Sequence, residues 1–246
     1  MNAGFYSPIF RMAAGHTESV DAAAQNLANC TTPGYRKLEV SHKVFSDILG
    51  QATNVPMTQK DGLAFDPLSV DFAEGPVQPT DRPLDFALRG PGFFVVSKNG
   101  QDYFTRKGDF SLDPDGALLN SDGMAVQGED GAVNIPPETD IHQLTVDDDG
   151  TLRTANQTFS KLKIATFQDT SQLVRAGTTL FAAPSGVEPE LGDSATRVTN
   201  RTLEQSNTSV AEEMADLIKT VRAYEACQRM IRNNDDNTGK MIQQMS

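Results

Sequence analysis

The sequence predicts an α+β protein in which an antiparallel coiled-coil stem of N- and C-terminal helices carries a β-rich central domain, a small sandwich or open barrel. Apolar residues recur at heptad spacing at both ends of the chain, which predicts the stem. Short aromatic and β-branched runs alternate with turn residues in the middle, which predicts the β domain. Hydrophobic residues make up only 38% of the 246 residues and Trp is absent, so an extended subunit completed by neighbours is favoured.

The first predicted element is a helix over residues 5–29. Its apolar seam alternates spacings of 4 and 3 residues, as in a coiled coil. The seam is weak, because two of its members are Ala and one is His, and such a helix needs a partner. Pro33 and Gly34 end it. The seam residues are Ile9, Ala13, His16, Val20, Ala23 and Leu27.

Residues 37–67 form a connecting segment of mixed polarity without a sustained period, which we expect to be partly flexible. Residues 68–204 form the β-rich central domain. Short strand-like runs such as FFVV from Phe93 are separated by hairpin signals such as Asn99-Gly100 and Asp149-Gly150. LDPDGAL from Leu112 resembles VDDDGTL from Val146, which two hairpins of similar build explain.

The last predicted element is a long helix in the C-terminal segment. Ser209 with Glu212 three residues later is a capping-box signature. Spacings of 4 and 3 then continue for about 30 residues, or roughly 45–50 Å of helix. Residues 1–36 and 205–246 would together form the stem. The seam grows polar towards its end and consists of Val210, Met214, Leu217, Val221, Tyr224, Gln228, Ile231, Asp235, Thr238 and Ile242.

The charge balance and the cysteines exclude several classes of protein. A net charge of −12 and a pI near 4.6 provide no basic stripe for phosphates, so we expect no nucleic-acid partner. No run reaches the roughly 18 apolar residues of a membrane span, and the N-terminus lacks the pattern of a cleavable signal peptide. Cys30 and Cys227 form no CxxC motif, and level pairing of the helices would separate them by roughly 15 Å. Two free thiols are therefore expected.

No candidate catalytic, cofactor or metal site emerges. His16, His42 and His142 do not have the spacing of a metal motif. The Asp-rich turns around Asp113 and Asp147 lack the twelve-residue loop and terminal Glu of a calcium site, so hairpin chemistry is the preferred interpretation. No nucleophile stands in an activating context. We expect no enzyme, no cofactor and no small-molecule substrate.

Three separated stretches resemble one known family, the bacterial flagellar rod and hook proteins. The stretches cover most of the chain and follow the family's order. Within the rod group, residues 82–88 and 234–239 are similar to the proximal-rod type, whereas AYEA at 223–226 is equally typical of the distal-rod type. The stretches are NLANCTTPGYR from Asn26, PLDFALRGPGFFVV from Pro83 with YFTRKGDFSLDPDGAL from Tyr103, and SNTSVAEEMADLIKTVRAYEACQRMIRNNDDNTGKMI from Ser206.

This resemblance implies a structural subunit of the flagellar basal-body rod, which self-assembles helically into the axial drive shaft that carries motor torque to the hook and filament. The implied partners are copies of itself, other rod and hook-type subunits and the flagellar type III export apparatus. The implied location is the periplasm-spanning rod, reached without a cleavable signal peptide. The expected assembly and stem interface consists of Ile9, Ala13, Val20, Ala23, Leu27, Val210, Met214, Leu217, Val221, Tyr224 and Ile231.

Two alternatives stay open at this point. The first is a secreted ligand-binding β module that its terminal coiled-coil helices merely oligomerise. Such a module would tolerate exchange of its stem for any coiled coil, whereas a rod subunit would not. The second is an enzyme acting on cell-wall material, which would need a carboxylate cleft that the sequence does not identify.

Overall fold

The computed structural model describes residues 17–39, 69–155, 157–191 and 196–244, with the side chains of 227, 231 and 234–244 left out. The chain divides into two compact units. Unit 1 comprises Met1–Ala28, Leu38–Asp71 and Ser209–Ser246, and unit 2 comprises Asn29–Lys37 and Phe72–Thr208. The chain therefore crosses between the units four times.

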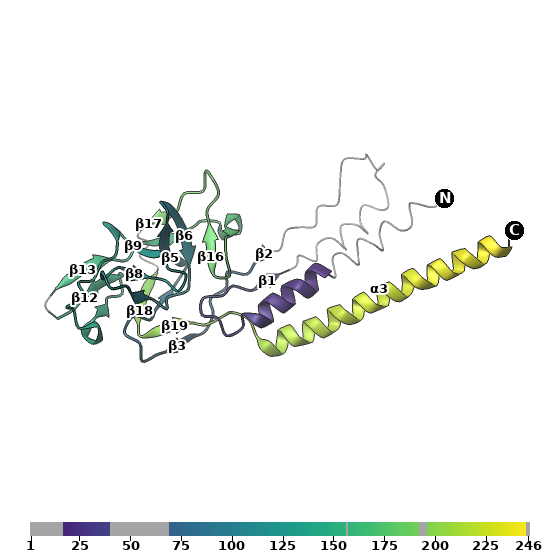
Figure 1. The fold of residues 1–246 in the computed structure, drawn as a ribbon, viewed down its shortest axis with the longest axis horizontal. Helices are drawn as coiled ribbons and strands as arrows, with labels where there is room; N and C mark the ends of the chain where they lie inside the picture. Colours follow the sequence, from purple (N-terminus) through teal and green to yellow (C-terminus); the bar gives the residue numbers. More distant parts are fainter. Residues whose placement is uncertain (1–16, 40–68, 156, 192–195, 245–246) are drawn as a thin grey trace. The chain divides into compact units, whose positions relative to one another are not determined.

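The described part of unit 1 contains two helices and one small sheet. The N-terminal helix covers residues 17–28, and α3 covers Val210–Gln244 as one continuous helix (Figure 1). Strands β1 (Leu38–Glu39) and β2 (Ser69–Val70) pair antiparallel. As the capping-box signature predicts, α3 begins directly after Ser209, whose carbonyl accepts a hydrogen bond from the Glu213 N–H. No helix in the described residues combines the length and the apolar character that crossing a membrane requires.

The prediction of an antiparallel coiled-coil stem is wrong. The described structure is β-rich, with one long helix and one short N-terminal helix. Among the described residues the N-terminal helix covers only 17–28, about 18 Å, against about 52 Å for the 35-residue α3, so no paired stem of two long helices is shown. The α3 seam residues Val210, Met214 and Val221 are exposed, as unpacked knobs would be. Ile9, Ala13 and His16 lie outside the described residues.

Unit 2 is built from short antiparallel strands. The largest sheet has ten strands, with β15-β16-β6-β5-β9-β8-β7 as its main path, β10 beside β9, and β14 between β5 and β17. Its strands are β5 (Gly92–Lys98), β6 (Gln101–Thr105), β7 (Ser111–Leu112), β8 (Leu118–Leu119), β9 (Ala125–Gly128), β10 (Gly131–Ala132), β14 (Ile164–Thr166), β15 (Val174–Arg175), β16 (Leu180–Ala182) and β17 (Glu190–Leu191).

Three smaller sheets complete unit 2. One has three strands, β11 (Thr145–Val146), β12 (Thr151–Arg153) and β13 (Thr158–Lys161). Two have two strands: β18 (Arg197–Asn200) with β4 (Phe86–Arg89), and β19 (Thr202–Glu204) with β3 (Val77–Pro79). The 3₁₀ turns η1 (Ile141–Gln143) and η2 (Thr170–Gln172) lie between strands.

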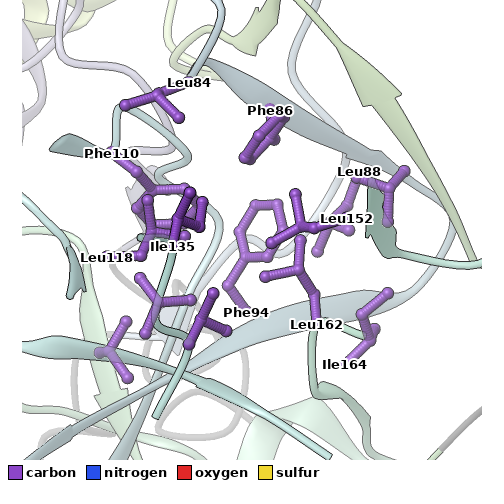
Figure 2. Packing of buried hydrophobic residues seen from close by; sticks show 14 of the residues in the cluster. Leu84, Phe86, Leu88, Phe94, Phe110, Leu118, Ile135, Leu152, Leu162 and Ile164 are labelled. Atoms are coloured by element: carbon purple, nitrogen blue, oxygen red, sulfur yellow. The ribbon is translucent and has the colours of Figure 1, made fainter. Parts of the chain in front are cut away.

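One hydrophobic cluster holds these sheets together. Figure 2 shows side chains from several strands, among them Phe86 of β4, Phe94 of β5 and Leu152 of β12, pointing into one shared interior. The Phe94 and Phe110 rings meet edge to face at 5.2 Å between centroids, the arrangement that aromatic quadrupoles favour. Because the strands are short, this shared burial rather than any single ladder stabilises unit 2.

The turn chemistry matches the sequence pattern. Asn99 and Gly100 have φ angles of 55° and 81°, and the flanking Lys98 and Gln101 pair across the hairpin. This is the conformation for which Asn-Gly is favoured, because Gly lacks the Cβ that a left-handed backbone would crowd.

The Asp-rich turns use their carboxylates to hold the backbone. Asp113 Oδ1 accepts hydrogen bonds from the N–H groups of Asp115 at 3.0 Å and Ala117 at 2.7 Å. Asp149 Oδ1 accepts one from the Thr151 N–H at 3.1 Å, and this bond holds the pKa of Asp149 below its ordinary value. Within the described residues no three metal-ligating side chains gather.

Asp109 is perturbed in the opposite direction. Burial raises the pKa of Asp109 because the charged form is poorly solvated, and Lys107 opposes this shift through an ion pair of 3.3 Å. The backbone of Asp109 forms an isolated bridge with that of the buried Asp85. The pKa shifts of Asp109 and Asp149, which both lie in unit 2, are therefore opposite in direction.

We predict opposite pH dependences for two isosteric variants. Folding raises the pKa of Asp109 above 3.8, so its contribution to stability is full below pH 3.8 and is lost as the pH rises through the raised pKa. The contribution of Asp149 is full above pH 3.8 and is lost as the pH falls through the lowered pKa. Urea unfolding followed by circular dichroism, from below pH 3.8 to neutrality, should show Asp109→Asn gaining stability relative to the unsubstituted protein as pH rises, and Asp149→Asn losing it. Parallel pH profiles for the two variants would contradict the assignment.

Candidate assembly surface and the anchored corner

The apolar stripe on α3 is the candidate assembly surface. Val210, Met214, Ile218 and Val221 are between 39% and 51% exposed. At about 100° per residue their directions fall within about 80° of one another, so they share one side of the helix. An exposed apolar stripe of this kind is typical of a surface that a partner covers.

The other predicted interface residues fall into four groups. Leu217 and Tyr224 on α3, with Val20 and Leu27 on the N-terminal helix, are half-buried, and Ala23 is buried. The side chain of Ile231 is not described, and Ile9 and Ala13 lie outside the described residues. The structure adds Ile218, which stands beside the heptad positions.

An asparagine organises unit 1 next to this stripe. The side chain of the buried Asn26 accepts a hydrogen bond from the Leu38 N–H at 2.8 Å and donates one to the Leu38 carbonyl at 2.9 Å. It also donates to Glu213 Oε2 of α3 at 3.1 Å. A single side chain thus satisfies the backbone of β1 and holds the first turn of α3.

The corner that follows the N-terminal helix belongs to unit 2. Gly34 has a φ of 68°, and a Cβ there would lie 2.4 Å from the Lys107 backbone nitrogen. The Gly34 N–H donates to the Glu204 carbonyl at 2.8 Å. Only glycine suits this position, because any side chain would clash with the neighbouring backbone in a conformation that L-residues disfavour.

A buried ionic group fixes this corner. Arg36, Arg106 and Glu204 are all almost fully buried. Glu204 Oε1 lies 2.7 Å from Arg36 Nη2, and Glu204 Oε2 lies 3.3 Å from Arg106 Nη1. The Gly75 N–H donates to Glu204 Oε1 at 2.9 Å. Burial lowers the pKa of Arg106 to about 10, and the Glu204 carboxylate opposes that shift.

A third arginine closes over the corner. The Arg175 guanidinium stacks on the ring of Tyr35 at 4.9 Å and on that of Phe181 at 5.5 Å, and its Nη2 donates to the Arg36 carbonyl. Burial lowers the pKa of Arg175, and Tyr35 opposes the shift. Tyr35 and Arg36 are thereby held on both sides within unit 2.

A second asparagine, Asn207, ties three chain segments of unit 2 together. Its Oδ1 accepts a hydrogen bond from the Lys37 N–H at 2.7 Å, and its Nδ2 donates to the Ala73 carbonyl at 3.1 Å. Its own N–H donates to the Tyr35 carbonyl at 3.4 Å. The adjacent residues Lys37 and Leu38 are therefore each held by an asparagine of their own unit.

Sequence reasoning missed five residues of this arrangement, because their partners are distant in the sequence. Asn26 could have been identified from the sequence, because it stands in an Ala-rich helix and an amide on a buried helix face needs hydrogen-bond partners. Glu204 and Asn207 look like ordinary polar residues near a strand end. The missed residues are Asn26, Arg36, Arg106, Glu204 and Asn207.

We predict that Glu204→Gln lowers the free energy of unfolding of unit 2 by about 3–5 kcal/mol, because two buried guanidinium groups lose their counter-charge. Chemical denaturation followed by circular dichroism measures the loss. The matched control is Asp148→Asn, which breaks the exposed pair with Arg197 and should cost at most about 1 kcal/mol. Equal effects of the two substitutions would refute the role assigned to Glu204.

We predict that Asn207→Ala lowers hydrogen-exchange protection of the Lys37 amide by about tenfold or more, since the acceptor of that N–H is removed at a cost of about 1–3 kcal/mol. Asn207→Asp retains the acceptor and should preserve most of this protection, while the bond to the Ala73 carbonyl is lost. An unchanged exchange rate of the Lys37 amide in the alanine variant would show that the Asn207 side chain does not protect it.

Comparison with known proteins places these features in one family. Residues 87–154 match the flagellar hook protein FlgE/F/G D1 domain, and residues 199–244 match the flagellar basal body rod FlgEFG protein C-terminal region. The second region contains Glu204, Asn207 and the whole apolar stripe.

Whole-chain relatives agree. The flagellar basal-body rod protein FlgF of Salmonella typhimurium is 31% identical over 91% of this chain and 90% of its own length. FlgF of Escherichia coli is 30% identical over 91% of this chain and 90% of its own length. The flagellar basal-body rod protein FlgG of Buchnera aphidicola subsp. Schizaphis graminum is 29% identical over 92% of this chain and 93% of its own length. The chain belongs to the family of flagellar basal-body rod proteins.

Proposed function

We infer that this chain is a structural subunit of the bacterial flagellar basal-body rod. Family membership over nine-tenths of the chain carries this inference. The relatives are named as rod proteins, and the buried ionic corner of unit 2 suits a structural role. A secreted ligand-binding module gains no support from a specific feature of the described residues.

The subunit assembles through its terminal segments in this proposal. Residues 1–36 and 205–246 carry the assembly interface, 37–67 connect, and 68–204 supply the β-rich outer domain. The apolar stripe on α3 supports this division, because its exposed aliphatic groups gain burial only from a neighbour. The proposed interface comprises Ile9, Ala13, Val20, Ala23, Leu27, Val210, Met214, Leu217, Val221, Tyr224 and Ile231.

The proposed partners are further copies of this chain, other rod and hook-type subunits, and the flagellar export apparatus that delivers the subunit. Torque transmission requires that each subunit resist twisting. The buried Arg36–Glu204–Arg106 group supports that role, because it leaves the corner of unit 2 one low-energy arrangement. We place the subunit in the proximal rod, on the strength of residues 82–88 and 234–239.

We predict that Val221→Asp abolishes motility and removes the protein from purified basal bodies, because a carboxylate would be buried in a subunit contact. Ala226→Asp is the matched control: it introduces the same charge on an exposed position about 140° around the helix and should leave motility largely intact. Swimming assays, with blotting of isolated basal bodies, measure both.

A motile Val221→Asp strain whose basal bodies contain the protein would contradict the proposed interface. Circular dichroism of the purified variant checks that unit 2 remains folded. The β-sheet contribution to the spectrum should be the same as in the unsubstituted protein, since Val221 lies in unit 1.

A further inference from the structure

Two strand edges of unit 2 are open and apolar. Strands β15 and β17 each have a pairing partner on one side only within the described residues. Val174 on β15 is 57% exposed and Leu191 on β17 is 58% exposed, the two most exposed large apolar side chains described. Open strand edges pair readily with other chains, so natural proteins cover them or protect them with charge.

The β17 edge borders a groove. Leu191, Leu162 and Ile164 provide apolar lining for a volume of about 660 Å³. Thr196, which is 5% exposed, also lines the groove, and its hydroxyl has no hydrogen-bond partner among the described residues.

The charge around the groove suits a second copy of this chain. Lys161 pairs with Glu129 at 2.8 Å, and Arg197 pairs with Asp148 at 3.3 Å, so both signs alternate along the rim. The whole chain carries a net charge of −12, and two copies repel each other over most of their surface. A locally neutral rim with an apolar floor is where this repulsion is least.

We propose that the β15 edge of one copy docks in the groove beside β17 of the next copy, with Val174 against Leu191. The contact joins two different surfaces, so it can repeat head to tail from copy to copy, which is the type of contact that a helical shaft uses. The added backbone pairing would give unit 2 its own lateral contact, separate from the α3 stripe. This proposal rests on the proposed function and names a contact within it.

Disulfide trapping tests the contact. Cys30 and Cys227 are the only cysteines of the chain, so Cys30→Ala and Cys227→Ala provide a clean background. Basal bodies containing both a Val174→Cys and a Leu191→Cys subunit are oxidised and run on a non-reducing gel. The expected product is a dimer that reduction abolishes, and the doubly substituted chain should give a ladder.

The control pairs Lys98→Cys, at the exposed β5–β6 hairpin, with Leu191→Cys and should give no dimer above the single variants. Basal bodies that contain the subunits without a 174–191 dimer above this control would overturn the contact and leave the rod function standing. Dimers formed equally by Leu191→Cys alone would also overturn it, in favour of a two-fold contact. Absence of the background chain from basal bodies would overturn the rod function and this contact together.

Discussion

The interaction on which the anchored corner depends is the burial of one carboxylate between two arginines. Removing Arg36, Arg106 and Glu204 from water is costly, and the cost is offset only when all three meet with short contacts. The three residues come from the corner after the N-terminal helix, the loop after β6 and the end of β19. Their meeting therefore draws together segments that lie as much as 168 residues apart in the chain. The Gly75 N–H donates to the Glu204 carboxylate, and the Gly34 N–H donates to the Glu204 backbone carbonyl.

Directly after Arg36 the chain passes from unit 2 to unit 1, between Lys37 and Leu38. An asparagine side chain binds the backbone on each side of this crossing. Asn207 holds Lys37 within unit 2, and Asn26 holds Leu38 within unit 1. Asparagine suits both positions, because one side chain offers a donor and an acceptor and can replace a neighbouring strand. A charged side chain would satisfy only one of the two backbone groups.

The two units distribute stability differently. Unit 2 closes its own core, with Phe86, Phe94 and Phe110 buried among residues from several sheets. In unit 1, α3 exposes aliphatic groups along one side. In the proposed function neighbouring subunits would cover that side and add to the stability of the helix.

The sequence by itself determined the local elements. Asn99-Gly100 specifies a hairpin, Ser209 marks the start of α3, and the short aromatic runs become strands, because turn, cap and pattern preferences act over a few residues. Heptad spacing predicted a coiled-coil stem and was wrong, since spacing defines an apolar face without saying what covers it. Only the tertiary structure decided that Glu204 and Asn207 anchor the corner and that Ile218 joins the stripe. Those roles depend on partners far away in the chain, and no local pattern records them.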